Sequence, residues 1–469
     1  MNKVIKSVIA SVMLIISIYC YKIVSDMNII PNKYLYLLLG IIIVLNLLGI
    51  LFLFIRGIGF KVVGVIIYIV LGILSIVGIK YGSNTISYLN KGFNNNNLEV
   101  SKYNVVVLKD SSYKKLKDLD DLKIGYLKVN TDGRDYLDVI RKKVKANYSS
   151  YDINKLYTGF INKEIDSIVI EDSYLDMLEE QFKNFSSSIR IIYSYTIKKE
   201  EKKVEKNINK LKPFNVYISG SDSRSNEIVA NSRSDVNMIA SVNPNTNTIV
   251  LTSIPRDYYV QLHGTTGLKD KLTHAGIYGV DMSRETLEDL FQIKIDYSIK
   301  VSMSSVVSLV DLVGGVDIDS DTTFNSYHIK GWTVNKGINH MNGKQALAYA
   351  RERYAYENGD VHRVQNQQQV LEAVLQKIIS DKTILLKYES LLNSFSNLYR
   401  TDIPKDLITL LVKEQLNDMK SWNIEKQYVD GTGSMAETYS MPGVKLYVMN
   451  PSDSSLKKAI NKIKDTIDE

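Results

Sequence analysis

The chain has 469 residues, of which 45% are hydrophobic and 23% charged, and its formal net charge is +7. This length leaves room for more than one domain, while so small a net charge, without any segment dense in Lys and Arg, gives no indication of nucleic-acid binding. The one cysteine, Cys20, falls within an apolar run, which excludes an intrachain disulfide framework and a cysteine metal site.

Three apolar stretches lie in the first 80 residues, at Val4–Ile23, Leu35–Ile55 and Val62–Ile79. Each is close to the roughly 20 residues that cross about 30 Å of hydrocarbon. The alternative is a signal peptide followed by buried core helices, but no small-residue cleavage site precedes the second stretch. We therefore expect residues 1–81 to form a membrane anchor of three transmembrane helices.

The flanking charges predict the orientation of this anchor. Lys3 and Lys6 lie at the start of the first stretch, and Arg56 and Lys61 lie between the second and the third. The positive-inside rule places both of these basic flanks in the cytoplasm. We expect a multi-pass protein of the cell membrane in which everything after about Tyr81 lies on the extracellular face.

Residues 98–197 alternate between strand-like and helix-like patterns, after a short linker of asparagines. The candidate strands are Tyr103–Leu108, Leu122–Leu127, Ile165–Ile170 and Ile189–Tyr195. This alternation predicts a small α/β accessory domain. It loosely resembles one lobe of a solute-binding protein, but we favour the interpretation of a spacer without a ligand. Residues 198–212, rich in Lys and Glu, predict a helical connector.

From Pro213 the pattern indicates a larger α/β (α+β) domain that extends to residue 469, with a central sheet flanked by helices. Buried strands are expected at Asn215–Ser219 and Thr248–Thr252. Its size of about 250 residues allows a substantial core. The expected helices are Met282–Gln292, Ser304–Leu312 and Val364–Ile379.

Asp and Arg recur together at the ends of these elements. The clusters are GSDSR with Asp222 and Arg224, RSD with Arg233 and Asp235, SIPRD with Arg256 and Asp257, YARER with Arg351 and Arg353, and GDVHRVQNQQ with Asp360, Arg363, Gln367 and Gln368. Any single pair is most simply a solvent-exposed ion pair. Five such clusters, most of them beside Gly or Pro turns, indicate a common site.

The spacing of the clusters predicts their geometry. Residues i and i+2 of an extended backbone face the same way, so we expect Asp222/Arg224, Arg233/Asp235 and Arg351/Arg353 each to point two groups to one side. Asp360 is expected to cap a helix. Arg363 and Gln367 then lie one turn apart on its surface.

The chemistry of these residue types indicates a bound diphosphate. Arginine offers a planar fork of donors that matches phosphate oxygens and stays charged. Converging arginines require an anion of high charge, and a hard cation, Mg²⁺ or Mn²⁺, reconciles that anion with neighbouring carboxylates. We expect Asp222 and Asp235 to bind the metal, and Asp360 to act as the general base.

These clusters, in this order, resemble the LytR–CpsA–Psr family of cell-wall phosphotransferases over residues 213–379. The segments that carry the resemblance are NVYISGSDSR, RSDVNMI, LTSIPRDYYV, KLTHAGIYG, LVDLVGGVDID, GKQALAYARER and GDVHRVQNQQQVL, with a weaker extension through YSMPGVKLYVMNP. A membrane anchor followed by an intervening accessory domain is similar to the capsule-type members.

The resemblance implies a Mg²⁺-dependent phosphotransferase that acts outside the membrane. Its donor is a glycopolymer linked to polyprenyl pyrophosphate, such as a teichoic acid, a capsule or another secondary polysaccharide. The polymer and one phosphate pass to peptidoglycan, at the C6 hydroxyl of N-acetylmuramic acid, through a phosphodiester. Two alternatives stay open: a polyprenyl-pyrophosphate hydrolase, and a non-catalytic sensor or regulator of lipid-linked cell-wall intermediates.

The resemblance also assigns roles to residues. It implies Asp222 and Asp235 as the carboxylates at the metal, and Asp360 and Arg256 as catalytic residues. The residues that it implies for pyrophosphate binding are Arg224, Arg233, Arg256, Arg351, Arg353, Arg363 and Gln367. The chain departs from the family pattern at Tyr258, Thr273 and Asn366, positions that bear on acceptor or polymer preference.

The polyprenyl tail requires an apolar slot. Six apolar residues have the helical spacing to line one: Val306, Leu309, Val310, Val370, Leu371 and Val374. Ordinary core packing is the alternative for each of them.

Overall fold

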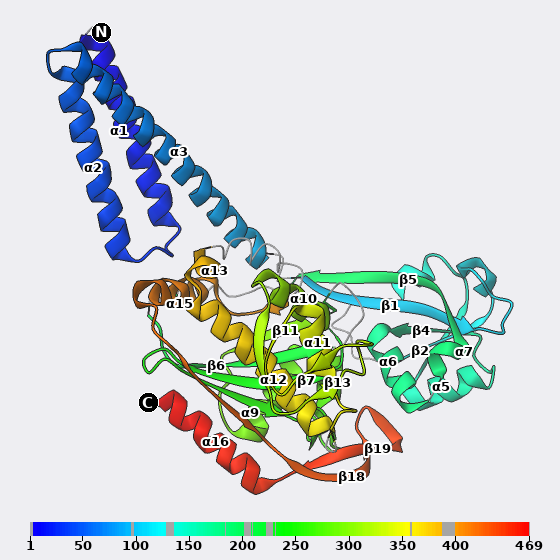
Figure 1. Ribbon diagram of the computed structural model, residues 1–469. Coiled ribbons are helices and arrows are strands. Elements are labelled where there is room, and N and C mark those ends of the chain that lie inside the picture. Colours follow the sequence, from blue (N-terminus) through cyan, green and yellow to red (C-terminus); the bar gives the residue numbers. More distant parts are fainter. Residues whose placement is uncertain are drawn as a thin grey trace.

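The structure is a computed structural model of the chain. It describes residues 3–94, 98–127, 136–182, 184–200, 208, 210–221, 228–229, 231–356, 359–386 and 399–468. Three parts follow one another along the chain, as Figure 1 shows: a helical bundle, an accessory unit with its own sheet, and a larger C-terminal unit.

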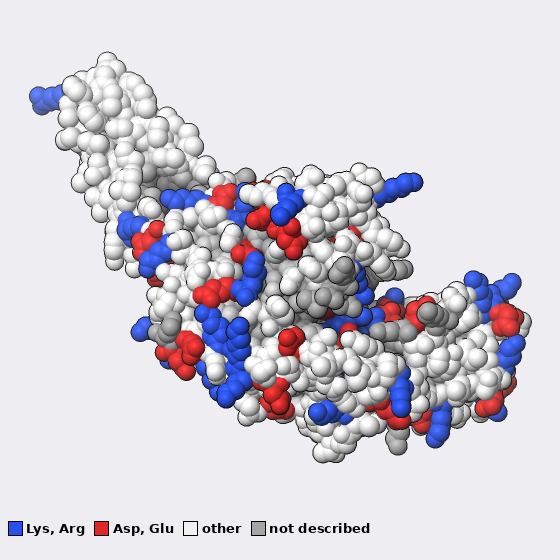
Figure 2. Space-filling model, turned by 60° about the horizontal axis from the view of Figure 1, so that its bottom comes forward, with Lys and Arg blue, Asp and Glu red and all other residues white. Residues whose placement is uncertain are grey.

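The bundle contains three helices that are long and apolar enough to cross a membrane, as the sequence predicts. They are α1 (Lys3–Asp26), α2 (Asn32–Phe54) and α3 (Ile58–Asn94). The bundle is almost bare of charged atoms on the face drawn in Figure 2, in contrast to the rest of the chain. Polar contacts join the helices, since Asn46 Nδ2 lies 3.4 Å from Ser17 Oγ and Tyr68 donates to the Asn46 carbonyl at 3.3 Å.

The loop between α1 and α2 packs against helix α15 (Lys405–Asp418) of the C-terminal unit. Met27 and Ile29 contact Val412 and Leu416, and Lys413 donates to the Asn28 side chain at 3.3 Å. This loop therefore lies at the same end of the bundle as the C-terminal unit, while the N-terminus lies at the other end (Figure 1).

The accessory unit is a five-stranded mixed sheet in the order β3-β2-β4-β1-β5. Its strands are β1 (Leu98–Leu108), β2 (Lys123–Leu127), β3 (Asn147–Tyr151), β4 (Ser167–Glu171) and β5 (Ile189–Glu200). Its helices are η2 (Leu116–Leu119), α4 (Asp138–Arg141), α5 (Ile153–Ile161), α6 (Asp172–Gln181) and α7 (Phe185–Ser188).

Both faces of this sheet are covered, because successive side chains of β1 point to opposite sides. Val106 packs with Leu156 of α5 and Leu178 of α6, whereas Val105 and Val107 pack against η2 and α4. The accessory unit is thus a small α/β sandwich with two cores, which is the fold class that the sequence predicts.

The C-terminal unit is built on a six-stranded mixed sheet in the order β16-β11-β6-β7-β8-β17. Its strands are β6 (Phe214–Ser221), β7 (Val236–Asn243), β8 (Thr248–Ile254), β11 (Tyr297–Ser302), β16 (Tyr399–Thr401) and β17 (Asn423–Tyr428). Strands β6, β7 and β8 are antiparallel, while β11 and β17 pair in parallel with β6 and β8.

Helices cover both faces of this sheet, as Figure 1 shows. Tyr217 and Ile239 face α9 (Val280–Phe291) and α16 (Asp453–Asp468). Their neighbours Val216 and Ala240 face the opposite side, which α15 and α12 (Gly359–Ser380) cover. The mixed α/β fold with a central sheet that the sequence predicts is confirmed.

A smaller layer packs beyond α12, where Val310 and Tyr349 share a core with Val370. It consists of α10 (Met303–Leu312), β12 (Val316–Ser320), β13 (Phe324–Asn325), β14 (Thr333–Val334), β15 (Gly337–Met341), α11 (Gly343–Arg351) and α13 (Lys382–Leu386). The remaining elements are β9 (Tyr259–Val260), β10 (Asp270–Lys271), α8 (Leu272–Ala275), η3 (Gly276–Tyr278), β18 (Gly431–Thr438) and β19 (Met441–Pro451).

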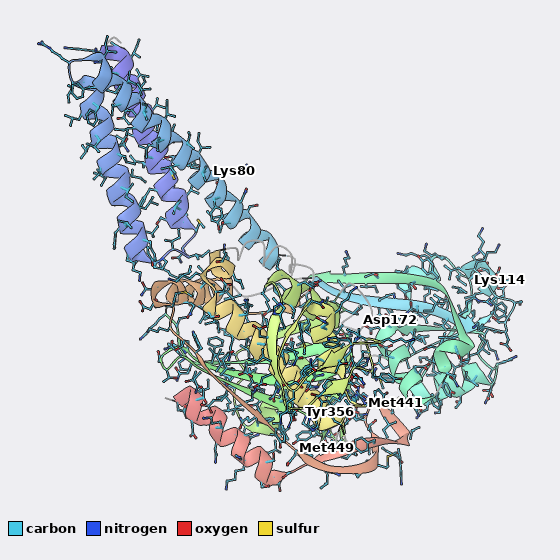
Figure 3. The ribbon with its side chains drawn as sticks, in the orientation of Figure 1. Lys80, Lys114, Asp172, Tyr356, Met441 and Met449 are labelled. Atoms are coloured by element: carbon cyan, nitrogen blue, oxygen red, sulfur yellow. The ribbon has the colours of Figure 1, made fainter. Side chains whose placement is uncertain are left out.

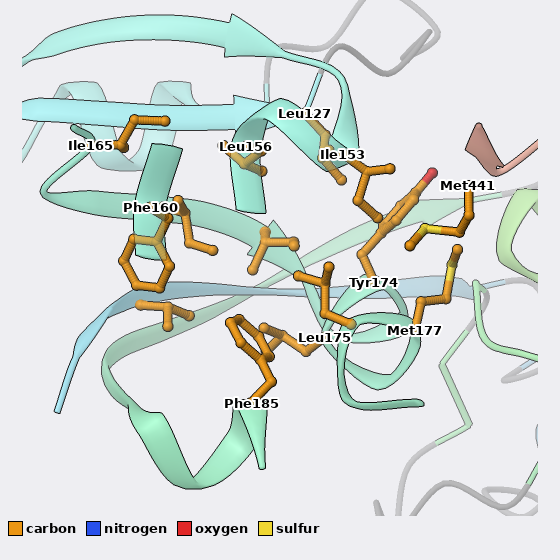
Figure 4. Close-up of a cluster of buried hydrophobic side chains, with 14 of the residues drawn as sticks. Leu127, Ile153, Leu156, Phe160, Ile165, Tyr174, Leu175, Met177, Phe185 and Met441 are labelled. Carbon is orange, nitrogen blue, oxygen red and sulfur yellow. The ribbon is translucent and has the colours of Figure 1, made fainter. Parts of the chain in front are cut away.

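The β18–β19 hairpin joins the C-terminal unit to the accessory unit. Met441 enters the accessory core beside Ile153, Tyr174 and Met177, as the close-up in Figure 4 shows. Asn154 of α5 also donates to the Pro442 carbonyl. The two units therefore share a continuous apolar contact.

A buried carboxylate lies at the same junction. Glu171, at the end of β4, is 6% exposed. Burial raises the pKa of Glu171 to about 7, although polar contacts with Ser101 and Asn231 and the ammonium of Lys300 oppose the rise. Asn231 and Lys300 belong to the C-terminal unit, so the pKa of Glu171 depends on the contact between the two units.

Residues 198–200 of the predicted helical connector are strand, because β5 extends to Glu200 and pairs with Leu98 of β1, while residues 201–207 and 209 lie outside the described residues. The extended geometry expected for Arg351 and Arg353 is wrong, because Arg351 is the last residue of α11. The backbone of Asp360 lies in the first turn of α12, which begins at Gly359, and its side chain lies outside the described residues.

We expect Glu171→Gln to raise the melting temperature at pH 8 by roughly 5–10 °C and to leave it nearly unchanged at pH 4. The folded chain keeps this proton up to about pH 7, whereas the unfolded chain loses it near pH 4.5. The stability contributed by the neutral carboxyl is thus complete below about pH 4.5 and lost as the pH rises to 7.

The measurement is thermal unfolding of the full chain in detergent between pH 4 and 8. Glu164→Gln removes an exposed carboxylate of the same unit and is the control. A Glu171→Gln variant that keeps the pH slope of the parent chain would contradict the assignment.

Candidate active site

An ion pair between Asp235 and Arg256 lies where strands β7 and β8 meet their loops. Arg256 Nη1 is 2.8 Å from Asp235 Oδ1, and the two side chains are 19% and 12% exposed. Arg256 follows the end of β8, and Asp235 directly precedes β7, the antiparallel neighbour of β8. The structure thus brings together two clusters that lie about 20 residues apart in the sequence.

Main-chain hydrogen bonds fix the loops that carry this pair. The Asp235 amide donates to the Gly220 carbonyl at 2.8 Å, and the Ser234 amide donates to the Thr273 carbonyl at 3.1 Å. The Thr273 amide in turn donates to the Arg256 carbonyl at 2.8 Å. Residue 276 has to be glycine in this arrangement, because a Cβ there would lie 2.5 Å from Ser234 Oγ.

A second ion pair adjoins the first. Lys271 Nζ is 2.7 Å from Asp257 Oδ1, and these side chains are 5% and 14% exposed. Asp257 Oδ2 also lies 3.7 Å from Arg256 Nε. The four groups alternate in sign from Asp235 through Arg256 and Asp257 to Lys271, which lowers the cost of burying them.

Lys271 has no role among the predicted site residues, although it lies in the segment KLTHAGIYG that carries part of the family resemblance. Lysine is mostly found exposed, so its burial was not evident before β10 and β9 were seen to pair, with Lys271 opposite Tyr259. The signal available in the sequence was a basic residue between a strand and a short helix.

Arg351 and Arg353 flank a buried carboxylate. Glu352 is fully buried, and its two oxygens accept from the amides of Tyr327, Arg353 and Tyr354 at 2.9, 3.1 and 3.1 Å. Burial lowers the pKa of the Arg351 guanidinium from its usual value. Such a shift marks a cation for which a bound anion would be favourable.

Helix α12 contributes Arg363, which is 8% exposed, and Gln367 one turn later, half-buried on the same side of the helix. The next residue, Gln368, points away and donates to the Gln427 carbonyl at 2.7 Å. Gln368 therefore fastens α12 to β17, while Arg363 and Gln367 have the geometry that the sequence predicts.

Several sequence-predicted residues have no described side chain. Asp222 and Arg224 lie outside the described residues, and so does the side chain of Asp360, although the backbone of Asp360 lies in the first turn of α12. Arg233 is half-buried two residues before Asp235. The roles assigned to these four residues remain predictions, as do those of the site residues whose side chains are described.

The described residues offer few candidate ligands for a metal ion. Within them, no group of three or more His, Cys, Asp or Glu side chains is arranged to hold an ion. Of the two predicted metal ligands, only Asp235 lies among the described residues, and its Oδ1 accepts a hydrogen bond from Arg256. A Mg²⁺ ion that uses one or two carboxylates and completes its shell with substrate oxygens and water fits this donor set.

The residues predicted to line a lipid slot pack together in the structure. Five of the six belong to one cluster between α10, α11 and α12, and Leu371 packs on the sheet side of α12. Val310, Val370 and Val374 are 0%, 4% and 3% exposed. They form core contacts here, so lipid entry at this place requires α10 and α12 to separate.

The three departures from the family pattern are all buried. Tyr258 is 0% exposed and donates to the Asp430 carbonyl at 2.6 Å. Thr273 is 1% exposed, and Asn366, 3% exposed, donates to the Tyr349 carbonyl at 3.0 Å. Tyr258 and Asn366 thus bind main-chain carbonyls of the interior, and all three side chains are turned away from solvent.

A buried polar network connects the site to the β18–β19 hairpin. His274 Nδ1 lies 2.6 Å from Asp270 Oδ1, and both residues are at most 2% exposed. The other oxygen of Asp270 accepts from the Ser440 amide at 2.8 Å and from its hydroxyl. The hairpin also binds the Arg256 loop, because the amide of Met449, labelled in Figure 3, donates to the Asp257 carbonyl at 2.7 Å.

Comparison with known proteins gives one consistent result. The model of the LytR_cpsA_psr family matches residues 181–462, more than half of the chain. A polyisoprenyl-teichoic acid–peptidoglycan teichoic acid transferase TagU from Enterococcus faecalis is 29% identical over 269 residues, which cover 57% of this chain and 86% of the relative. TagU of Bacillus subtilis is 30% identical over 285 residues, which cover 61% and 88%.

Among solved structures, B. subtilis TagV matches 55% of this chain and 98% of its own length. The sequence identity is 28% and the TM-score 0.47.

We expect Lys271→Met to lower the free energy of unfolding by about 3 kcal/mol, because it leaves Asp257 buried without its lysine partner. The control is Lys163→Met. Lys163 makes an ion pair of nearly the same length, 2.8 Å to Asp110, but its side chain is 67% exposed. That change should cost less than about 1 kcal/mol. Urea unfolding of both variants tests the difference, and equal losses would contradict the buried geometry.

Proposed function

Since the chain belongs to the LytR–CpsA–Psr family, we propose that it transfers a glycopolymer from polyprenyl pyrophosphate to a peptidoglycan hydroxyl, and that its Asp/Arg site holds the pyrophosphate of the donor. The relatives named above are teichoic acid transferases, which supports a teichoic acid or a related polymer as the cargo. The acceptor is the C6 hydroxyl of N-acetylmuramic acid.

The arginines hold the donor. Arg256, Arg351 and Arg363 are wholly or partly buried, on the β8 loop, the end of α11 and the first turns of α12. Helices α11 and α12 pack together, since Asn366 donates to the Tyr349 carbonyl. Guanidinium groups in such places bind phosphate oxygens bidentately at little cost in side-chain entropy, because packing has already fixed them. Arg233, Arg353 and Arg224 complete the proposed set.

The Asp235–Arg256 pair is the observation that carries the proposal. It keeps a guanidinium at the edge of the sheet in a fixed direction without a ligand, and Lys271 balances the charge of Asp257 behind it. Preorganised donors of this kind stabilise charge that develops in a phosphoryl-transfer transition state.

Asp235, with Asp222, is proposed to bind Mg²⁺. When bound, the ion neutralises oxygens of the pyrophosphate and of the leaving group. The protein's own side chains bind the donor, align it and accept the proton of the acceptor hydroxyl.

The proposed reaction is one displacement. The acceptor hydroxyl oxygen forms a bond to the phosphorus that bears the sugar, and the phosphoanhydride bond to the second phosphorus breaks. Asp360 takes the hydroxyl proton, and polyprenyl phosphate leaves with the electron pair. The sugar-linked phosphate becomes a phosphodiester, so no oxidant or other co-substrate is needed.

The three apolar helices give this reaction a location. The donor lipid lies in the bilayer that these helices are suited to cross. The basic flanks Lys3, Lys6, Arg56 and Lys61 support an extracellular C-terminal unit under the positive-inside rule. The α1–α2 loop lies at the end of the bundle away from the N-terminus, and its contact with α15 shows that the C-terminal unit lies at this end.

We expect Arg256→Ala to reduce transfer from a lipid-pyrophosphate donor at least 100-fold. Arg256→Lys keeps the charge but loses the planar fork, so it should restore only a small part of the rate. The control is Arg141→Ala, which removes an exposed arginine of the accessory unit. The assay follows radiolabelled polymer into peptidoglycan with the full chain in detergent.

The same assay separates the alternatives. Release of polyprenyl phosphate at one rate with and without peptidoglycan would identify a hydrolase. Donor binding without turnover under any condition would identify a sensor. Full transfer by Arg256→Ala would exclude the proposed site.

We expect a metal chelator to stop transfer and added Mg²⁺ or Mn²⁺ to restore it. Asp235→Asn should raise the Mg²⁺ concentration needed for half-maximal rate by about tenfold, because one ionised ligand is lost. Calorimetric titration of Mg²⁺ in the presence of donor lipid provides a readout besides activity. Undiminished transfer in the chelator would contradict a metal requirement.

A further inference from the structure

Two exposed tyrosines lie beside the arginines at the end of α11. Tyr327 and Tyr354 are 68% and 71% exposed. Their ring centroids are 4.3 Å apart, with 40° between the ring planes. We call these two residues the tyrosine pair. Contiguous exposed apolar surface marks interaction and ligand sites, whereas single exposed rings need no explanation.

The tyrosine pair is held in place by a buried charge. The Glu352 carboxylate, fully buried, accepts from the amides of both tyrosines and from that of Arg353. Hydrogen bonds to an ionised acceptor are roughly twice as strong as neutral ones. One carboxylate therefore fixes the backbone of both tyrosines and of Arg353 relative to each other.

A second contact ties the Tyr327 loop to the same helix end. His328 Nε2 lies 3.2 Å from the Arg351 carbonyl, and the Tyr327 and His328 rings meet edge to face with centroids 5.6 Å apart. Ser326 Oγ accepts from the His328 amide at 3.2 Å. The loop thus packs around the C-terminal end of α11, and these contacts hold the Tyr327 ring in a fixed position.

The chemistry of this surface suits a sugar ring. A pyranose has an apolar face of C–H groups that stacks on an aromatic ring, and hydroxyls at its rim that stay hydrated or bind polar groups. An isoprenoid chain would require an enclosed apolar slot, which two rings about 70% exposed do not provide. The neighbouring Arg353 adds donors for the rim and for an attached phosphate.

We propose that Tyr327 and Tyr354 form a subsite for the pyranose joined directly to the pyrophosphate of the donor. The proposal rests on the proposed function and deepens it. Tyr354 follows Arg353 in the chain, so their Cα atoms lie roughly 3.8 Å apart. The tyrosine pair thus adjoins an arginine proposed to hold the pyrophosphate to which the sugar is joined.

The test compares two lipids on the full chain in detergent: undecaprenyl pyrophosphate, and the same lipid that carries one N-acetylhexosamine. The double variant Tyr327→Ala/Tyr354→Ala should bind the sugar-bearing lipid about tenfold more weakly and the bare lipid as tightly as the parent chain. Tyr327→Phe/Tyr354→Phe keeps the rings and should bind both lipids normally. Tyr428→Ala removes a tyrosine that is 49% exposed at the end of β17 and serves as the matched control.

Each outcome bears on the proposal. Equal weakening for both lipids, or normal binding of both by the Ala variant, would overturn it. Loss in the Phe variant as well would show recognition by hydroxyl groups instead of stacking and would also overturn it. If the parent chain binds neither lipid, the proposed function itself fails, and the subsite fails with it. A melting temperature equal to that of the parent chain verifies that each variant folds.

Discussion

The ion pair between Asp235 and Arg256 is the contact on which the arrangement of the site depends. It joins the loops of two antiparallel strands, and each loop is further bound to the segment around Thr273 by main-chain hydrogen bonds. A half-buried pair of this kind adds little net stability, because desolvation offsets most of the attraction. Its effect is directional: it fixes where a guanidinium points. The neighbouring Asp257–Lys271 pair allows that guanidinium to remain at the sheet edge without an excess of charge.

The accessory unit is connected to this arrangement. Met441, at the tip of the β18–β19 hairpin, is part of the accessory core, and the adjacent Ser440 binds Asp270. Asp270 and His274 belong to the same segment as Thr273 and Lys271. A continuous set of contacts therefore runs from the accessory core to the loop of Arg256. The placement of Glu171 against Asn231, four residues before Asp235, adds a second route between the two units.

Much of this could be predicted from the sequence, for identifiable reasons. The membrane helices are long uninterrupted apolar runs, and the strands β1, β4, β6 and β8 are runs of branched or aromatic residues. Strand β7 was missed because it buries polar side chains: Asn237 accepts from the Tyr217 hydroxyl at 2.6 Å, and Asn243 donates to the Thr466 carbonyl at 2.8 Å. Its pattern becomes strand-like only once those partners are known.

The candidate site shows the same limit. The residue types and their positions at element ends predicted a diphosphate site, but not the partners of each charge. The extended geometry expected for Arg351 and Arg353 was wrong because the alanine-rich α11 continues through Arg351. The burial of Lys271 depends on pairing between β9 and β10, which no local pattern indicates.

A structure of the full chain with undecaprenyl pyrophosphate and Mg²⁺ tests the central claim most directly. It should place the diphosphate against Arg256, Arg351 and Arg363; a diphosphate bound elsewhere, with the Asp235–Arg256 pair unchanged and solvent around it, would contradict the account.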